Sequence, residues 1–400
     1  MVGTTAAATQ EIESDSRRWN LILTDQRGHK LESADGNVIS MSHSIEASTD
    51  EFTIGEIFTQ NINIELRRAI DQDETIIFDY DQNSAIEIAY GLRDAPGIIH
   101  MGTFRVKTVE KVRDRIRLNL KDYFINELSD TYTPSSSLPD PAPILDVMQD
   151  ICSEYLPVHV YEYLHILDDE REGEYVIAYD RAWSPLFVRS TAPTDDHGTP
   201  ITLSQTEVQY LSGKKVSDAL RICAGILGVS LVKGRDNSLT CVRPSRVPVT
   251  ITSSRAADPD FSGKEQKIIG VVCKLNDDVY SADTFEYWEE DEQHQPLEEG
   301  IYIEYENPFM KDTIYDLWFS SAIFGYTSWY MRPATINHML GDPRLDPLDM
   351  VRYEDLYEDG YERSGTFQMP IMSMDYTFDG GLSCTLRTTA KYKYKEDNNG

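Results

Sequence analysis

An alternation of apolar and polar residues in two neighbouring segments constrains the fold more than any other feature of this chain. The first segment is Gly102–Glu110 and the second is Arg115–Leu120, with Arg113 and Asp114 in the break between them. A period of two is typical of a β-strand with one face in a core and the other in solvent. Because the break is short, we predict a tight antiparallel hairpin.

Similar strand-like segments form two blocks, one towards each end of the chain. The first block contains the hairpin and the segments Trp19–Thr24, Val38–His43, Asn61–Leu66 and Ser84–Tyr90. The second block contains Lys267–Leu275, Gly300–Tyr305, Met350–Tyr353, Thr366–Met374 and Tyr376–Arg387. The 23 tyrosines agree with a strand-rich protein, because tyrosine favours strands. We therefore predict a β-dominated α+β fold with two antiparallel β domains.

A mixed region of helix and hairpin is predicted between the two blocks. Apolar residues recur at helical spacing in Ala142–Leu156 and again from Ser217 to Leu227. The second helix is expected to end at Gly228 and to lead into a hairpin that turns at Asp236 and Asn237. Residues 252–264 are interpreted as a polar linker, and residues 158–200 follow no clear pattern.

Five segments follow from these patterns. They are a flexible N-terminal arm (1–16), a first β domain (17–130), a middle α+β region with linkers (131–263), a second β domain with one helix around 309–323 (264–391), and a disordered charged tail (392–400).

The charge balance of the chain opposes sequence-independent binding of nucleic acid. There are 68 acidic and 37 basic residues, for a formal net charge of −31. Binding through counterion release needs clustered lysine and arginine, whereas an acidic surplus favours solubility. The densest basic run, Lys107 to Arg117, alternates with apolar residues, so we interpret it as the polar face of a strand.

Known catalytic motifs for metal, phosphate, dinucleotide and acyl chemistry are absent from the sequence. Asp79–Asn83 begins like a calcium loop, but Ser84 stands where glycine is needed, so an acidic turn is predicted. The acidic run Glu289–Glu292 contains enough carboxylates for glycoside hydrolysis, although a solvated loop is the simpler interpretation. His294 and His338 lack companion ligands. We predict no enzyme, no catalytic residue, no cofactor and no metal.

The cysteines and the N-terminus bear on the compartment. Five cysteines occur without any Cys-x-x-Cys pair, which predicts free, mostly buried thiols in a reducing cytoplasm: Cys152, Cys223, Cys241, Cys273 and Cys384. No signal peptide, and no apolar run long enough to cross a membrane, is expected.

The segment Gly341–Val351 is predicted to be a rigid loop with a scaffolding role. Pro343 and Pro347 fix φ, and Gly341 permits the turn at which the loop begins. Its carboxylates are expected to cap turns or to face neighbours. The aromatic segment Phe319–Tyr330 could form a sugar platform, but an amphipathic helix leading into a strand is favoured.

Several segments, taken in order, resemble one protein family over residues 20–390. They are Ile54–Phe58 before Ile62–Leu66, Met101–Val106 continued by Arg117–Tyr123, Val216–Leu231 closing with Asn237–Leu239, Asn307-Pro308, Gly341–Pro343 with Leu345 and Asp349, and Asp379–Leu382. The chain resembles the tail-hub or baseplate-hub proteins of long-tailed bacteriophages and related contractile devices.

This resemblance implies two tube-type β domains per chain, so that a homotrimer presents six similar units. Such a trimer adapts a six-fold tail tube to a three-fold tip and surrounds the channel through which DNA leaves. It implies a structural virion protein at the tail tip or baseplate, assembled in the host bacterial cytoplasm, without a membrane anchor. The alternative function is that of a tail-tip protein that binds carbohydrates or a receptor, or that degrades cell walls.

The resemblance also implies partners and structural residues. The partners are further copies of the chain, distal tail or tail-tube proteins, a tape measure protein, and a separate tip, spike or receptor-binding protein, while DNA passes through the lumen without specific binding. The structural or interface candidates are Asn307, Pro308, Gly341, Asp342, Pro343, Asp349, Gly380 and Gly381.

Overall fold

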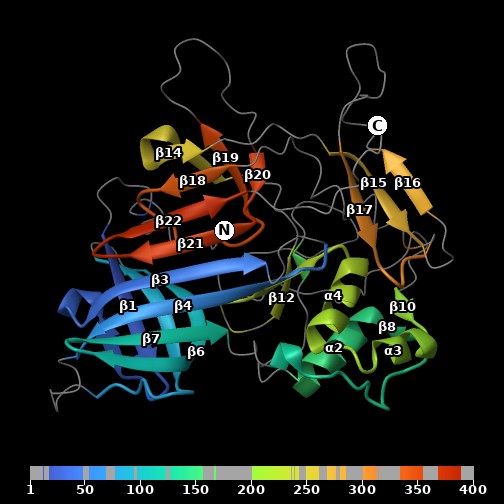
Figure 1. The fold of residues 1–400 in the computed structure, drawn as a ribbon, viewed down its shortest axis with the longest axis horizontal. Coiled ribbons are helices and arrows are strands. Elements are labelled where there is room, and N and C mark those ends of the chain that lie inside the picture. The colour runs from blue at the N-terminus through green and yellow to red at the C-terminus, as the bar shows by residue number, and fades with distance from the viewer. Residues whose placement is uncertain are drawn as a thin grey trace, which may run out of the picture.

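The structure is a computed structural model (Figure 1). It describes residues 12, 18–47, 54–68, 77–93, 97–122, 127–155, 166–167, 201–235, 237, 239–242, 249–260, 268–275, 280–284, 301–311, 314, 334–354 and 368–388. Within these ranges the chain is built mainly of strands, which confirms the predicted β-dominated α+β class. No helix of the described part is long and apolar enough to span a bilayer.

One 14-stranded sheet organises the molecule, and it contains strands from both ends of the chain. The continuous path runs β14-β18-β22-β21-β3-β4-β7-β6-β5-β1-β2. The bounds of these strands are β1 Trp19–Asp25, β2 Lys30–Glu32, β3 Val38–Ala47, β4 Ile57–Arg67, β5 Ala85–Leu92, β6 Ile98–Val112, β7 Arg115–Asp122, β14 Ala256–Asp260, β18 Thr335–His338, β21 Ser373–Phe378 and β22 Leu382–Arg387.

The two blocks of strands meet where β21 pairs with β3. These antiparallel strands pair over their length from Ser373↔Glu46 to Phe378↔Met41. Figure 1 shows the red C-terminal strands lying directly beside the blue N-terminal ones. The predicted bounds of the two β domains stay a prediction, but their strands share hydrogen bonds in one sheet.

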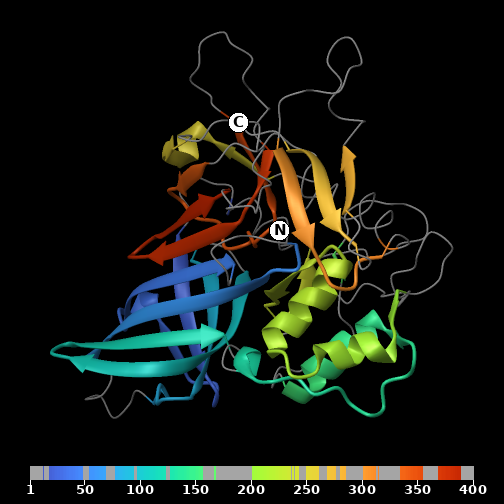
Figure 2. The ribbon, with the colours of Figure 1, turned by 45° about the vertical axis from the view of Figure 1, so that its right-hand side comes forward.

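Smaller elements surround the main sheet: in Figure 1 the helices and β15–β17 lie to its right, and β19 and β20 lie above β18 (see also Figure 2). The helices and the strands that extend the main sheet from β4 are α2 Ile144–Tyr155, α3 Gln205–Leu211, α4 Val216–Ile226, β9 Ile166–Leu167, β11 Ser230–Lys233 and β12 Leu239–Val242. Three small sheets contain β8 Ala142–Pro143 with β10 Thr202–Leu203, β13 Val249–Thr252 with β19 Met350–Glu354 and β20 Gln368–Pro370, and β15 Ile268–Lys274 with β16 Tyr280–Thr284 and β17 Ile301–Glu306.

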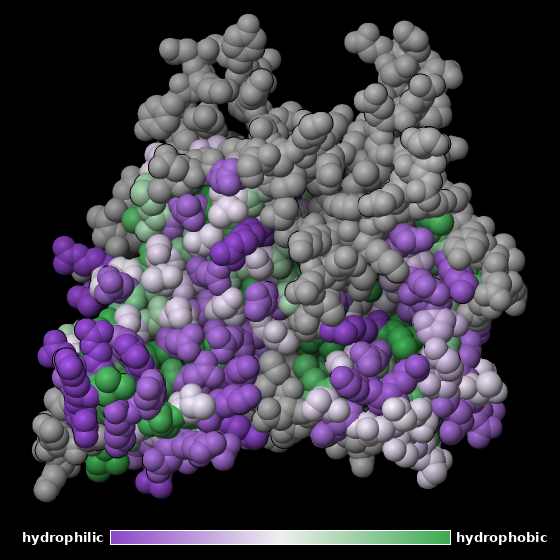
Figure 3. All heavy atoms as spheres, viewed as in Figure 1, coloured by the Kyte–Doolittle hydropathy of each residue, from purple (hydrophilic) through white to green (hydrophobic). Residues whose placement is uncertain are grey.

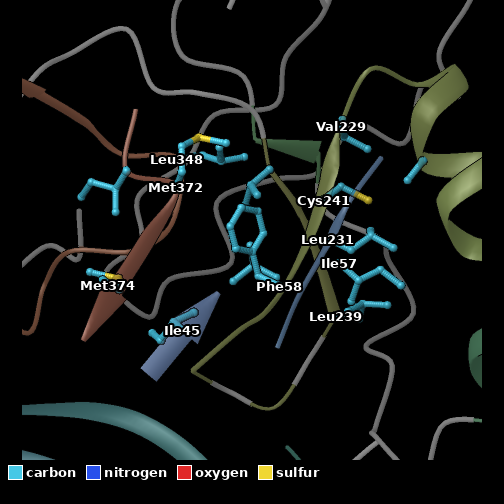
Figure 4. Close-up of a cluster of buried hydrophobic side chains, with 14 of the residues drawn as sticks. Ile45, Ile57, Phe58, Val229, Leu231, Leu239, Cys241, Leu348, Met372 and Met374 are labelled. Carbon is cyan, nitrogen blue, oxygen red and sulfur yellow. The ribbon is translucent and has the colours of Figure 1, made fainter. Parts of the chain in front are cut away.

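The core lies between the inner face of the main sheet and the elements around β11. Ile45 of β3, Phe58 of β4, Leu231 of β11 and Met374 of β21 are all nearly inaccessible to solvent. Figure 4 shows these four side chains in one apolar cluster, although they come from the first, middle and last thirds of the chain. The cluster therefore joins the three predicted regions.

Two predictions about the second half are wrong. Residues 252–264, interpreted as a linker, contain the strand β14, which pairs with β18 at the sheet edge. The predicted strand Thr366–Met374 is divided, because the chain leaves the small sheet after β20 and enters the main sheet at β21. Ile371 lies at this crossing, where its N–H donates to the carbonyl of Asp349.

Candidate functional site

The loop between β18 and β19, which we call the junction loop (Gly341–Asp349), is almost entirely buried. Asp342 and Arg344 are each 6% exposed, and Asp349 is 1% exposed. Buried charges of this kind are costly unless they are paired and hydrogen-bonded. Their partners therefore explain how the loop is held.

A bidentate ion pair within the loop neutralises the buried charges of Asp342 and Arg344. The Arg344 Nε and Nη2 atoms donate to the Asp342 carboxylate at 3.0 and 2.7 Å, and the Arg344 backbone N–H donates to the same carboxylate. The Tyr376 hydroxyl of β21 lies 3.0 Å from the carbonyl oxygens of Asp342 and Leu345. The loop is thus bonded to the strand at which the two blocks meet.

Glycine is required at the start of the loop for two reasons. Gly341 has φ of +51°, a left-handed conformation that favours glycine. A Cβ atom at this position would lie 2.7 Å from Cγ of Leu382 in β22. A side chain at Gly341 would therefore push the loop away from the main sheet.

Arg235 connects the junction loop to the middle region and to β6. It follows β11, and its guanidinium contacts the Asp346 carboxylate at 2.9 Å and donates to the carbonyl of His100 at 3.0 Å. At the end of the loop, Asp349 accepts a hydrogen bond from the N–H of Asp346 at 2.8 Å, which closes a turn. These contacts are those of a scaffold.

The remaining predicted site residues lie in two other places. Asn307 is buried and donates from Nδ2 to the carbonyl of Ile222 in α4 at 2.9 Å, while its Oδ1 accepts from Phe309 N–H beyond Pro308. Gly380 and Gly381 form the exposed turn between β21 and β22, with Gly380 at φ of +71°. The eight residues therefore do not converge on one site.

The sequence interpretation missed a cluster of buried polar side chains beneath the main sheet. The His43 Nε2 atom lies 2.8 Å from Gln60 Oε1, and the backbone N–H of Gln60 donates to Asp122. The Lys233 ammonium lies 3.8 Å from Asp122 and donates to the carbonyl of Thr103 at 2.6 Å. A period-two signal was available, since His43 lies between the inward residues Met41 and Ile45 of β3.

Burial dominates the titration of this cluster. It lowers the pKa of His43 to about 4, because the charged imidazolium would lose its hydration, although the Gln60 hydrogen bond opposes this shift. Burial also raises the pKa of Asp122, against the attraction of Lys233. None of these four side chains is more than 5% exposed. A substrate has no access to them, so the cluster is structural.

The outer face of the same strands carries small polar side chains. Thr377, Ser42, Asn63 and Asn119 lie opposite one another across β21, β3, β4 and β7. We call the following set the polar sheet face: Ser42, Ser44, Asn61, Asn63, Asn119, Asn337, Asp375, Thr377, Ser383 and Thr385. In Figure 3 the surface over β21, β3 and β4 is mainly white and purple.

The centre of this face is close to electrical neutrality although the chain is strongly acidic. Nine of these ten residues are uncharged, and the tenth, Asp375, forms an ion pair with Arg387. Charged residues flank this set on the same face: Glu46 and Lys121 lie beside it, and Glu65 forms an ion pair with Arg117. The Asn119 amide donates to both Asn61 and Asn63 at 2.9 Å, so the amides are ordered by one another. The centre of the face is therefore a surface of hydroxyl and amide groups.

Other predicted features have separate outcomes. All five cysteines are free and buried, as predicted. Asp79 accepts hydrogen bonds from Ser84 Oγ and from Asp81 N–H, as an acidic turn requires. Glu289–Glu292, His294 and the segment 319–330 lie outside the described residues, whereas His338 is buried in β18. The described part holds no cluster of three or more potential metal ligands.

Comparison with known proteins gives matches in structure but not in sequence. No family model matches the chain, and no curated protein is similar in sequence. The 43 kDa tail protein of prophage MuSo2 from Shewanella oneidensis superposes with a TM-score of 0.52 at 11% identity, covering 93% of this chain and 98% of that one. A tail protein from Neisseria meningitidis MC58 has a TM-score of 0.52 at 12% identity, covering 95% and 97%. This chain is similar to them in fold over nearly their whole length.

Proposed function

We propose that this chain, which shares the fold of phage tail proteins, is a structural virion protein of a phage-type tail. It acts by assembly, as a homotrimeric hub at the tail tip or baseplate. It adapts a six-fold tube to a three-fold tip and surrounds the channel through which DNA leaves. Its neighbours are tube or distal tail proteins, a tape measure protein and a separate tip protein, and it is assembled in the host cytoplasm.

The polar sheet face is the observation that carries this proposal. A surface that guides DNA without holding it needs few unpaired cations, because clustered lysine and arginine bind phosphates by releasing counterions. It also needs few unpaired anions, which would repel the passing strand. Six strands from both ends of the chain, β18 to β7 along the sheet, supply a face whose centre is of this kind. We assign it to the channel wall.

The buried junction supports an assembly role in a second way. Arg235 and Tyr376 bond the loop to the middle region and to β21, and Arg344 pairs with Asp342 within the loop, which favours a rigid connection between the two blocks of strands. A protein that transmits symmetry from one ring to the next requires such rigidity. The described polar clusters are either buried or paired, and none is arranged around a substrate.

Imaging of assembled tails tests the proposal. Cells that produce the tail should express this chain with a short epitope on its exposed Gly380–Gly381 turn. Gold-labelled antibody should then bind at the tip end of the tail, and cryo-electron microscopy should place three copies around a channel. A monomer that is absent from tails and binds or cleaves cell-wall glycans would overturn the proposal in favour of the carbohydrate-binding alternative.

A further inference from the structure

The tip of the β6–β7 hairpin concentrates positive charge in an otherwise acidic molecule. We call the following set the basic tip: Arg67, Arg68, Lys107, Lys111, Arg113, Arg115 and Arg117. Only three acidic residues, Glu65, Glu110 and Asp114, lie among them in the ranges 65–68 and 107–117. The basic tip therefore carries a local positive charge on a chain of net −31.

The basic tip lies at the surface, at one extremity of the molecule. Its hairpin residues are exposed, and Val112 beside them is 37% exposed. Figure 2 shows the hairpin projecting at the lower left, and Figure 3 shows hydrophilic side chains gathered there. Strand β5 pairs with β6 only as far as Arg105, so the edge of β6 beyond it has no described strand partner on that side. Charged side chains on an exposed strand edge oppose pairing with a strand of another chain. A partner would therefore contact this edge through charges of opposite sign.

A segment of opposite charge lies on the other side of the molecule. Residues 127–155, which include α2, contain six acidic residues and no basic residue. Asp130, Asp140 and Asp146 of this acidic segment are exposed. In Figure 1 α2 lies at the lower right, whereas the hairpin tip lies at the lower left.

We propose that the basic tip of one copy docks on the acidic segment 127–155 of the next copy. A contact between two different surfaces on opposite sides of one chain is head-to-tail, and it produces a closed ring when the rotation closes. The inference rests on the proposed function, because it supplies the lateral contact of the proposed trimer. It also predicts that this contact weakens with salt.

DNA is a poorer partner for the basic tip than a carboxylate surface is. Arg115 and Arg117 both contact the Glu65 carboxylate. The hydrogen bonds from these arginines lower the pKa of Glu65, and the bond from Arg115 has the largest effect. A DNA phosphate that approached these two arginines would therefore also approach the negatively charged Glu65 carboxylate. A protein surface can match the mixed charges of the tip one by one.

Charge exchange on the full chain tests the docking. Lys111→Glu/Arg113→Glu reverses the tip, and Asp130→Lys/Asp146→Lys reverses the acidic segment. We expect the wild-type chain to self-associate at low salt and to dissociate in ~1 M salt, where the Debye length is only ~3 Å. Each double variant should weaken association roughly tenfold or more, because like charges then face each other. Sedimentation equilibrium measures both effects.

A quadruple variant and a matched control complete the experiment. Combining all four exchanges should restore association, since the charges are again complementary. Lys30→Glu/Arg93→Glu changes the net charge equally at exposed positions outside the tip and should leave association unchanged. Association that ignores the tip and segment variants, or a wild-type chain that stays monomeric at low salt, would overturn the docking.

A DNA-binding assay distinguishes this docking from the alternative, DNA binding by the basic tip, and from failure of the proposed function. Fluorescence anisotropy with a short labelled duplex should detect no binding that depends on Lys111 and Arg113. Tip-dependent DNA binding without self-association would mean that the basic tip is a nucleic-acid contact. If epitope-labelled tails contain the chain but tip variants assemble normally, only the docking fails, whereas absence from tails removes the proposed function itself.

Discussion

The two faces of the same strands are built from opposite kinds of polar chemistry. The inner face of β3 places His43 among apolar side chains, and the junction loop below β21 adds the Asp342–Arg344 pair. The outer face of β3 places Ser42 and Ser44 in a neutral surface. Inside, the charges of Asp342 and Arg344 are paired, and removal of one partner would leave the other buried without compensation. Outside, small neutral groups contribute little to stability and remain available for contact.

Removal of one buried partner is the strongest test of this contrast. Arg344→Ala leaves the Asp342 carboxylate buried without its ion pair, so we expect a loss of about 3–5 kcal/mol in the free energy of unfolding. Arg387→Ala removes a similar pair with Asp375, but both side chains are at least 33% exposed, so about 1 kcal/mol or less is expected. Urea unfolding measures both, and equal losses would mean that burial does not distinguish the two faces.

Titration of the inner face gives the next largest effect. The pKa of His43 falls from 6.5 when unfolded to about 4 when folded, so the folded state resists protonation. This contribution is fully present above pH 6.5 and is lost as the pH falls towards 4, which amounts to about 3 kcal/mol.

The variant His43→Gln isolates this effect, because Asp122, which titrates in the opposite sense, is present in both proteins. The stability of the wild type relative to the variant should fall between pH 6.5 and pH 4. Urea midpoints measured at half-unit intervals of pH provide the curve. Parallel curves for the two proteins would show that His43 is not buried in its neutral form.

Two buried tyrosines provide a matched pair with a smaller effect. Tyr376→Phe removes the hydroxyl that bonds the junction loop, at an expected cost of about 1–3 kcal/mol. The Tyr90 hydroxyl is also buried but has no hydrogen-bond partner among the described residues, so Tyr90→Phe should be neutral or stabilising. Thermal melts of the two variants compare them directly. A greater loss at Tyr90 would contradict the assigned role of the Tyr376 hydroxyl.

Changes on the outer face should leave stability almost untouched. Ser42→Arg/Ser44→Arg is expected to alter the free energy of unfolding by about 0.5 kcal/mol or less. It should nevertheless create measurable affinity for DNA, since it adds unpaired cations to the proposed channel wall. Ser42→Gln/Ser44→Gln supplies similar bulk without charge and should not bind DNA in the same electrophoretic assay. Binding by both variants, or by neither, would argue against the channel assignment.

Local patterns predicted much of the fold. The alternation around Arg113 became the β6–β7 hairpin, the apolar spacing after Ala142 became α2, and the turn at Asn237 connects β11 and β12. Helix α3 was missed although Ser204 and Glu207 form a capping box, a signal that is visible in the sequence. These elements depend on residues close together in the chain, which is why a pattern can reveal them.

The site was less predictable, because its contacts join distant residues. Gly341, Pro343 and Asp349 were predicted to be scaffold residues, but nothing local indicates that Tyr376 and Arg235 bind the same loop. Lys233 and Asp122 lie 111 positions apart in sequence and approach only when β11 and β7 flank β4. Such pairing depends on the order of strands, which period-two alternation does not specify.

The sequence by itself determined the strand-rich class, the helices α2 and α4, the acidic charge balance and the free cysteines, because each follows from composition or from neighbouring residues. Only the tertiary structure decided that β21 pairs with β3, which brings both ends of the chain into one sheet. That pairing buries His43 on one side and aligns Ser42 with Thr377 on the other. Any two strands can form backbone hydrogen bonds with each other. Packing of the side chains therefore had to select β3 as the strand that pairs with β21.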